Sequence, residues 1–144
     1  MKRDDNEKTS VSLSDKYTRI GLYITGYSRS VFGEIDNFNV LEGSFAYDLY
    51  KTGEWGFGEF YIRKESIHSI VHQLRDFIRS DQIEVHIDEE LKIDMVRDRE
   101  KFVLVLSIND QKSEDYISVK KTLSYQNLYK TLLKPLYTIS KTYP

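Results

Sequence analysis

The sequence predicts an α+β fold, in which an antiparallel sheet of about six strands carries two helices packed on one face. Several short segments alternate apolar and polar side chains, which is the period of a half-buried strand. Two other segments repeat apolar side chains with the period of an amphipathic helix, one in mid-chain and one near its end. Because the strands are joined by hairpin-length connections, we expect the order to be roughly βββαβββα.

The first half of the chain predicts strands before any helix. Residues 17–28 and residues 44–52 alternate apolar and polar side chains, and residues 57–63 form a return strand after the turn "GEWG". Residues 29–43 mix apolar residues with Gly, Asn and Asp without a clear period, so we expect a long connection there, with a short strand or turn inside it as an open alternative.

The second half predicts a helix, further strands and a closing helix. Residues 64–80 repeat apolar positions at i, i+3, i+4 and i+7, which predicts an amphipathic helix. Ser124 is the expected N-cap of the closing helix, and Pro135 lies inside it, where its missing N–H should kink or divide the helix. Strands are expected at residues 82–87, 91–96, 101–108 and 116–123.

The length and composition are those of one globular domain, since 40% of the 144 residues are hydrophobic and 13% are aromatic. Residues 1–15 are polar and charged, so we expect a flexible N-terminal segment before a single domain at residues 16–144. The chain has no cysteine, and its N-terminus lacks the apolar core of a signal peptide. We therefore expect a cytoplasmic protein with no membrane contact.

The net charge of −2 is unevenly distributed along the chain. Residues 31–62 contain six acidic side chains against Lys51 alone, a sum of about −5. Trp55, the one tryptophan, lies in this segment, and the chain has 11 tyrosines. Aromatic anchors with an acidic rim are typical of protein interfaces that attract a basic partner, although Trp55 plugging the sheet edge is an open alternative. The residues expected to contact a partner are Glu34, Asp36, Asp48, Glu54, Trp55, Glu59, Asp88, Glu89 and Glu90.

Three glycines surround the tryptophan, at Gly53, Gly56 and Gly58. A phosphate-binding loop requires a Lys-Ser/Thr step after its last glycine, and a dinucleotide loop requires a helix after its glycines. These glycines instead lie between two predicted strands, and Glu54 and Glu59 would repel a phosphate. We therefore expect them to shape a hairpin turn.

A metal site or small hydrolytic enzyme is an alternative, because His68 and His72 are four residues apart on the first helix with Glu65 on the same side. That side points away from the apolar stripe, and "HSIVH" lacks the glutamate of the H-E-x-x-H motif, which favours a solvated helix face. No serine–histidine motif occurs. We expect no enzyme, no catalytic residue, no metal and no cofactor.

The C-terminal segment offers a second alternative, since no acid follows Asp115. A basic C-terminal helix can mark a nucleic-acid accessory protein. Dispersed lysines without an arginine are more typical of a solvated helix face, so we expect no nucleic-acid partner. The lysines in question are Lys120, Lys121, Lys130, Lys134 and Lys141.

Residues 45–140 resemble the WapI family of immunity proteins, small antidotes that protect bacteria from polymorphic toxins. "GEFYIRKESIHSIVHQLRDFI" looks like that family's strand ending in Gly-Glu-Phe and its following helix. "IEVHIDEELKIDMVRDREKFVLVLSIND" is similar to its paired strands, and "ISVKKTLSYQNLYKTLLKPLYTI" to its closing strand and helix. The resemblance implies an immunity or inhibitor protein that binds and neutralises a cognate toxin without catalysis. A homodimer formed through uncovered strand edges is a further open alternative.

Overall fold

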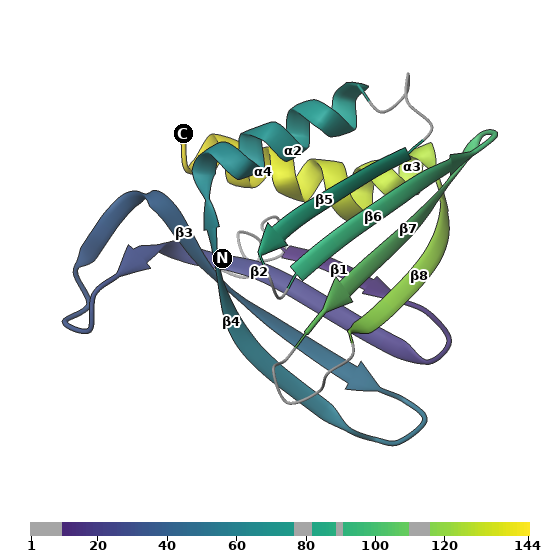
Figure 1. The fold of residues 1–144 in the computed structure, drawn as a ribbon, viewed down its shortest axis with the longest axis horizontal. Helices are drawn as coiled ribbons and strands as arrows, with labels where there is room; N and C mark the ends of the chain where they lie inside the picture. The colour runs from purple at the N-terminus through teal and green to yellow at the C-terminus, as the bar shows by residue number, and fades with distance from the viewer. Residues whose placement is uncertain (1–9, 77–81, 89–90, 110–115) are drawn as a thin grey trace.

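Two four-stranded antiparallel sheets form the framework of the protein (Figure 1). The computed structural model describes residues 10–76, 82–88, 91–109 and 116–144. The strands of each sheet are neighbours in sequence order, β1-β2-β3-β4 in the first and β5-β6-β7-β8 in the second. The first sheet contains β1 (Ser10–Ser14), β2 (Thr18–Arg29), β3 (Ile35–Leu49) and β4 (Trp55–Arg63), and the second contains β5 (Gln82–Asp88), β6 (Leu91–Asp98), β7 (Lys101–Ile108) and β8 (Ile117–Ser124).

The helices lie together along one end of the sheets, with α2 beside α4 (Figure 1). Helix α2 (Lys64–Asp76) connects the two sheets in sequence. The C-terminal helix consists of α3 (Tyr125–Leu128), a π-helical turn η2 (Tyr129–Leu133) and α4 (Lys134–Thr142). None of the helices in the described ranges has the length and apolar character needed to cross a membrane.

The C-terminal helix has the predicted N-cap, and near Pro135 it changes its hydrogen-bond pattern instead of dividing. Ser124 caps α3, because its Oγ accepts a hydrogen bond from the backbone N of Asn127 at 3.3 Å. Pro135 lies in the first turn of α4 and has no N–H to donate. Just before it, the backbone N–H of Lys134 donates to the carbonyl of Tyr129, five residues earlier. The helix therefore changes its hydrogen-bond pattern there without ending.

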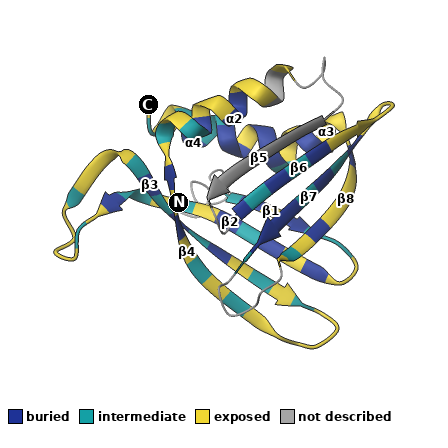
Figure 2. Cartoon of the chain, viewed as in Figure 1, coloured by how far each residue is buried: buried dark blue, intermediate teal, exposed yellow. Residues whose placement is uncertain are grey.

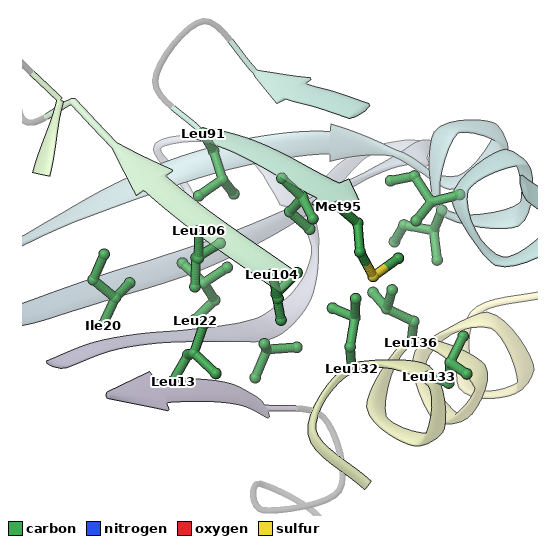
Figure 3. Packing of buried hydrophobic residues seen from close by; sticks show 14 of the residues in the cluster. Leu13, Ile20, Leu22, Leu91, Met95, Leu104, Leu106, Leu132, Leu133 and Leu136 are labelled. Carbon is green, nitrogen blue, oxygen red and sulfur yellow. The ribbon is translucent and has the colours of Figure 1, made fainter. Parts of the chain in front are cut away.

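The core lies between the two sheets and is closed at one end by the helices. Buried and exposed residues alternate along most strands, as the sequence predicts (Figure 2). A fully buried Leu or Ile contributes roughly 1.5–3 kcal/mol relative to an exposed one, so this shared interior is the main source of stability. Figure 3 shows Leu13, Ile20 and Leu22 of the first sheet, Leu91, Met95, Leu104 and Leu106 of the second, and Leu132, Leu133 and Leu136 of the C-terminal helix facing one space.

The predicted α+β class with antiparallel strands is confirmed, and the arrangement is more elaborate than expected. The described residues form eight strands rather than about six, and the strands form two sheets instead of one. The two sheets bury their apolar faces against each other, with the helices at one end rather than over one face. Alternation in a sequence reports which side of a strand is buried, but it does not report what covers that side.

The N-terminal strand corrects the expectation of a flexible segment for residues 10–15, and residues 1–9 of that predicted segment lie outside the described residues. Ser10–Ser14 pairs with β2 in antiparallel register, from Ser10 opposite Tyr23 to Ser14 opposite Arg19. Only two of its side chains, Val11 and Leu13, are buried. Two apolar residues among polar neighbours are too few to predict a strand from the sequence.

A hairpin arm replaces the long connection expected at residues 29–43. Strand β2 continues to Arg29 and β3 begins at Ile35, so both strands extend beyond the rest of the sheet (Figure 1). Shifts of the pairing register interrupt the two strands near Gly26 and near Ser28. Such bulges break the two-residue period, which is why the arm was not visible in the sequence.

Two of the three glycines around the tryptophan lie within β4 rather than in the turn. Gly53 is in the turn, with a φ of 75°. Gly58 is the cross-strand partner of Phe45, and Gly56 is the partner of Tyr47. A Cβ at either position would collide with the facing ring. These two glycines therefore make room for rings on the inner side of the sheet, which corrects the expectation that all three shape the turn.

Candidate functional site

Exposed aromatic rings gather on the outer face of the first sheet, along its edge strand β4. Trp55 is 68% exposed and Phe57 is 76% exposed. Their rings are nearly parallel, with an interplanar angle of 16° and centroids 6.1 Å apart. Tyr61 is exposed on the same side of the strand. Trp55 therefore faces solvent and does not fill the core.

A shallow hollow lies on the same face of this sheet, closer to β1. Small residues oppose one another across its floor, with Ser12 opposite Gly21 and Gly21 opposite Ala46. No heavy atom of the described structure, the glycine's own neighbours aside, lies within 4 Å of the place where a Cβ of Gly21 would stand. The hollow has a volume of about 260 Å³. Its border includes Arg19 and Tyr23 of β2 and Asp48 of β3.

Two side chains of opposite charge form one side of the hollow. Arg19 and Asp48 are cross-strand partners, and Trp55 continues the same row as the partner of Asp48 on β4. Within the described part of the chain, no ion pair shorter than 4.0 Å includes Arg19 or Asp48. Both side chains are exposed. The guanidinium offers only donors and the carboxylate only acceptors, so this row presents both kinds of hydrogen-bonding group to a ligand.

The predicted partner-binding residues occupy separate places. Asp48, Trp55 and Glu59 share the outer face of the first sheet, and Glu54 lies in the turn that precedes β4. The structure therefore brings four of the nine predicted residues to one region. The others do not join them: Glu34 and Asp36 lie on the hairpin arm, Asp88 ends β5, and Glu89 and Glu90 lie outside the described residues.

A basic edge is found where the turn between β1 and β2 meets β8, the edge strand of the second sheet. We use this name for Lys16, Tyr17, Lys120 and Lys121, all of which are exposed. The Nζ of Lys16 lies 5.8 Å from the centroid of the Tyr17 ring. Asp15 connects the two elements, because its Oδ2 accepts a hydrogen bond from the backbone N of Lys120 at 3.3 Å.

The carboxylate of Asp15 is held in its ionised form. Partial burial raises its pKa, but three backbone N–H donors and the positive charge of Lys121 outweigh the burial. Two of these donors, Tyr17 and Thr18, lie 2.8 and 2.9 Å from Oδ1. The pKa of Asp15 therefore lies below its ordinary value, and its charge is compensated locally.

A second basic surface lies on the C-terminal helix. Lys130, Lys134 and Lys141 are exposed and are spaced four and seven residues apart, so they fall on one side of the helix. We call them the lysine stripe. Strand β1 contacts both β8 and η2, the turn that contains Lys130. The basic edge and the start of the lysine stripe therefore border the same strand.

The residues of the metal alternative have other partners. His68 Nδ1 lies 2.8 Å from Ser140 Oγ, a contact that joins α2 to α4. In the chain as far as the structure describes it, no group of three or more His, Cys, Asp or Glu side chains could hold a metal ion. The remaining contacts are His72 Nε2 to Asp76 Oδ2 at 3.5 Å and Arg63 Nη1 to Glu65 Oε1 at 3.6 Å.

Sequence reasoning missed Arg19, Gly21 and Tyr23 as members of a site. Their only signal is their position at alternate places on the polar side of a predicted strand. What they face depends on the register of β2 with β1 and β3, and that register is a property of the folded sheet.

Comparisons with known proteins give no family and no curated relative, since no family model and no curated protein matches the chain. Similar solved structures include WHY3 from Arabidopsis thaliana, with a TM-score of 0.48, 10% identity, and coverage of 93% of this chain and 87% of that one. The plant transcriptional regulator PBF-2 has a TM-score of 0.42 and 11% identity, with coverage of 94% of this chain and 87% of that one. WHY1 from Arabidopsis thaliana has a TM-score of 0.44 and 10% identity, with coverage of 93% of this chain and 85% of that one. At these values we transfer no ligand and no residue role from them.

These similarities contradict the predicted immunity protein. The similar structures are plant proteins, one of them a transcriptional regulator, and none of the three is described as an immunity protein or a toxin partner. The prediction of a cognate toxin as partner, with nucleic acid excluded, is therefore wrong. The resemblance of residues 45–140 to the WapI family stays a prediction.

Proposed function

We propose that the protein binds single-stranded nucleic acid without catalysis, and that the basic edge holds the phosphate backbone. The supporting observation is that five lysines follow Asp115 with no acid among them, and all five are exposed. Lys120 and Lys121 lie on β8 and Lys130 on η2, and both of these elements contact β1. Three of the five lysines therefore lie on elements that border the first sheet at β1.

Electrostatics favour this border over the rest of the sheet as the phosphate-binding surface. Lysines that neutralise phosphates release condensed counterions, which makes binding strong at low salt and weak at high salt. Asp15 is the acid in the turn, and three backbone N–H groups already compensate its charge. Asp48 and Glu59 on the outer face of the sheet would repel a phosphate backbone laid across β4.

Exposed tyrosines next to these lysines favour a single strand over a duplex. Tyr17 is 59% exposed, and Tyr125 and Tyr129 of the C-terminal helix are also exposed. Bases stack on such rings with roughly 1–3 kcal/mol each, and only unpaired bases have free faces to stack. The arrangement therefore suits a sequence-tolerant contact with single-stranded DNA or RNA.

The experiment measures anisotropy of a labelled oligothymidylate at salt concentrations from about 50 to 200 mM. The test variant is Lys120→Gln with Lys121→Gln, and the matched control is Lys51→Gln with Arg63→Gln, which removes the same charge elsewhere. Each lost phosphate contact should reduce the slope of log K against log salt by about 0.7, so the test variant should lose about 1.4.

We expect the control variant to keep the wild-type slope, and a duplex of the same length to bind more weakly than the single strand. The proposal fails if the wild-type protein shows no salt-dependent binding. It also fails if the two variants lose affinity equally, because net charge alone would then explain the effect.

A further inference from the structure

We propose that the hollow on the outer face of the first sheet binds a guanine base, either as a free nucleoside or within a strand held by the basic edge. Within a strand, this inference rests on the proposed function. The hollow is open above Gly21, and its floor of Ser12, Gly21 and Ala46 presents no large side chain. Its volume of about 260 Å³ is just below the roughly 300–1,000 Å³ typical of sites for drug-sized ligands, which suits a single ring system.

One exposed aromatic ring borders the hollow and a second lies near it. Tyr23 borders it on β2 and is 44% exposed. Phe57 ends the row that contains Gly21 and Ala46, since it is the cross-strand partner of Ala46. A planar base over the small floor residues can therefore stack on Tyr23, and Phe57 lies one strand further along the same row. Stacking of this kind is favourable for every base and sets no preference.

The preference comes from the row of Arg19 and Asp48 at one side of the hollow. The carboxylate of Asp48 accepts hydrogen bonds through two oxygens, and guanine is the base that presents two adjacent donors, N1–H and the 2-amino group, on one edge. The guanidinium of Arg19 matches the acceptors O6 and N7 of the same base. Both side chains lack an ion-pair partner within the described residues, so neither must be released first.

Strand β1 lies between the hollow and the proposed phosphate surface. Its lining includes Ser10 and Ser12 of β1, and β1 contacts β8, which contains Lys120 and Lys121. A strand whose phosphates lie on the basic edge can therefore place one base across β1 into the hollow. The acid at Asp48 then recognises a base edge, where its charge is matched, instead of meeting a phosphate.

The test is a titration of the protein with guanosine, adenosine and cytidine, followed by the NMR shifts of the Gly21 and Ala46 amides and of the Trp55 indole N–H. Trp55 is the only tryptophan, so its indole signal is unambiguous, and it neighbours Asp48 in register. We expect guanosine to bind about tenfold or more tightly than the other two nucleosides. Equal binding of all three, or no shift at these positions, would overturn the proposal.

Substitution of Gly21 by valine fills the hollow without a predicted clash, because nothing lies within 4 Å of its Cβ position and φ there is not positive. A valine also suits a strand better than a glycine, so the melting temperature should stay equal or rise. We expect Gly21→Val to abolish the guanosine shifts, whereas Gly21→Ala keeps most of them. Asp48→Asn should remove the preference for guanosine, and Asp36→Asn on the arm should keep it.

The two proposals fail in different ways. The Lys120→Gln with Lys121→Gln protein should still bind free guanosine, because the nucleoside has no phosphate. Guanosine binding without any salt-dependent oligonucleotide binding would overturn the proposed function and leave the hollow as a base site. Salt-dependent binding of the oligothymidylate together with equal binding of guanosine, adenosine and cytidine would overturn the hollow alone.

Discussion

Asp15 and Lys120 are 105 residues apart in the sequence, yet Oδ2 of Asp15 accepts a hydrogen bond from the backbone N of Lys120 at 3.3 Å. The bond ties the first turn of one sheet to the edge strand of the other. An edge strand presents unpaired N–H groups, and here the carboxylate occupies one of them. The same contact brings Lys16 and Lys120 to one border of the molecule, so the charge pattern of the basic edge depends on it.

Replacement of Asp15 by alanine should destabilise the protein by about 1–2 kcal/mol, because three backbone N–H groups lose their acceptor. Urea unfolding at neutral pH measures this difference. Asp15→Asn keeps one side-chain oxygen acceptor, so its free energy of unfolding should fall by less than that of the alanine variant. If the alanine variant unfolded at the same urea concentration as wild type, the contact would have no role in stability.

Acid should remove the contribution of Asp15. Its pKa is lower in the folded protein than the ordinary value of 3.8, so the unfolded chain binds the proton more readily. The contribution of Asp15 to stability is therefore complete at a pH above its pKa in the unfolded chain. It is lost as the pH falls through the lower pKa of the folded protein. We expect the difference between wild type and Asp15→Asn to shrink in urea titrations below about pH 4. A difference that grew in acid would contradict the assigned cause.

Substitution of Gly58 by alanine should destabilise the protein by about 1–3 kcal/mol, because the new Cβ would meet the ring of the buried residue Phe45. Thermal unfolding monitored by circular dichroism measures the loss. Gly21→Ala is the matched control, since its Cβ has free space, and it should be neutral or slightly stabilising. Equal effects of the two substitutions would show that the loss of glycine itself is responsible.

Tyr143 should make stability fall at alkaline pH. Burial, with a smaller effect of Tyr27, raises the pKa of Tyr143 above its ordinary value of 10.0. The contribution of the neutral Tyr143 to stability is complete at a pH below its pKa in the unfolded chain. It is lost as the pH rises through the higher pKa of the folded protein. Tyr143→Phe should therefore lose less stability than wild type between about pH 9 and 11 in urea unfolding. Identical alkaline profiles would remove Tyr143 as the cause.

Zinc should leave the melting temperature unchanged, within about 1 °C, when added in equimolar amount. The reason is that His68 contacts Ser140 while His72 lies beside Asp76, so the two imidazoles have separate partners. Differential scanning fluorimetry with and without zinc checks this, with a chelator as the second control. A rise of several degrees would revive the metal site that the sequence offered as an alternative.

The elements with strong local signals could be predicted from the sequence. Ser124 marks the start of the C-terminal helix because capping depends on neighbouring residues alone. The alternation around Ile20 and Leu22 identifies an inward strand face, since a strand's two sides differ in solvent contact. Partition into two sheets was missed, because pairing and packing join residues that are distant in sequence.

The candidate site was predicted only in part for the same reason. Trp55 and Asp48 were selected from composition and charge, and they do lie together on an exposed face. Arg19 was overlooked because its place opposite Asp48 follows from the register of two strands separated by a bulged arm. The toxin-binding interpretation went wrong because aromatic and acidic residues are compatible with many partners.

The glycines of the β3–β4 hairpin also bear on strand slippage. Three inner-face rings each oppose a glycine: Phe45 faces Gly58, Tyr47 faces Gly56 and Phe60 faces Gly43. A slip of two residues keeps the faces of both strands correct, so burial alone would tolerate it. In one direction, however, such a slip sets Phe45 against Phe60, and in the other it sets Tyr47 against Glu54. The glycines thus favour the observed alignment, in which each ring has space, and that alignment places Trp55 opposite Asp48 on the outside.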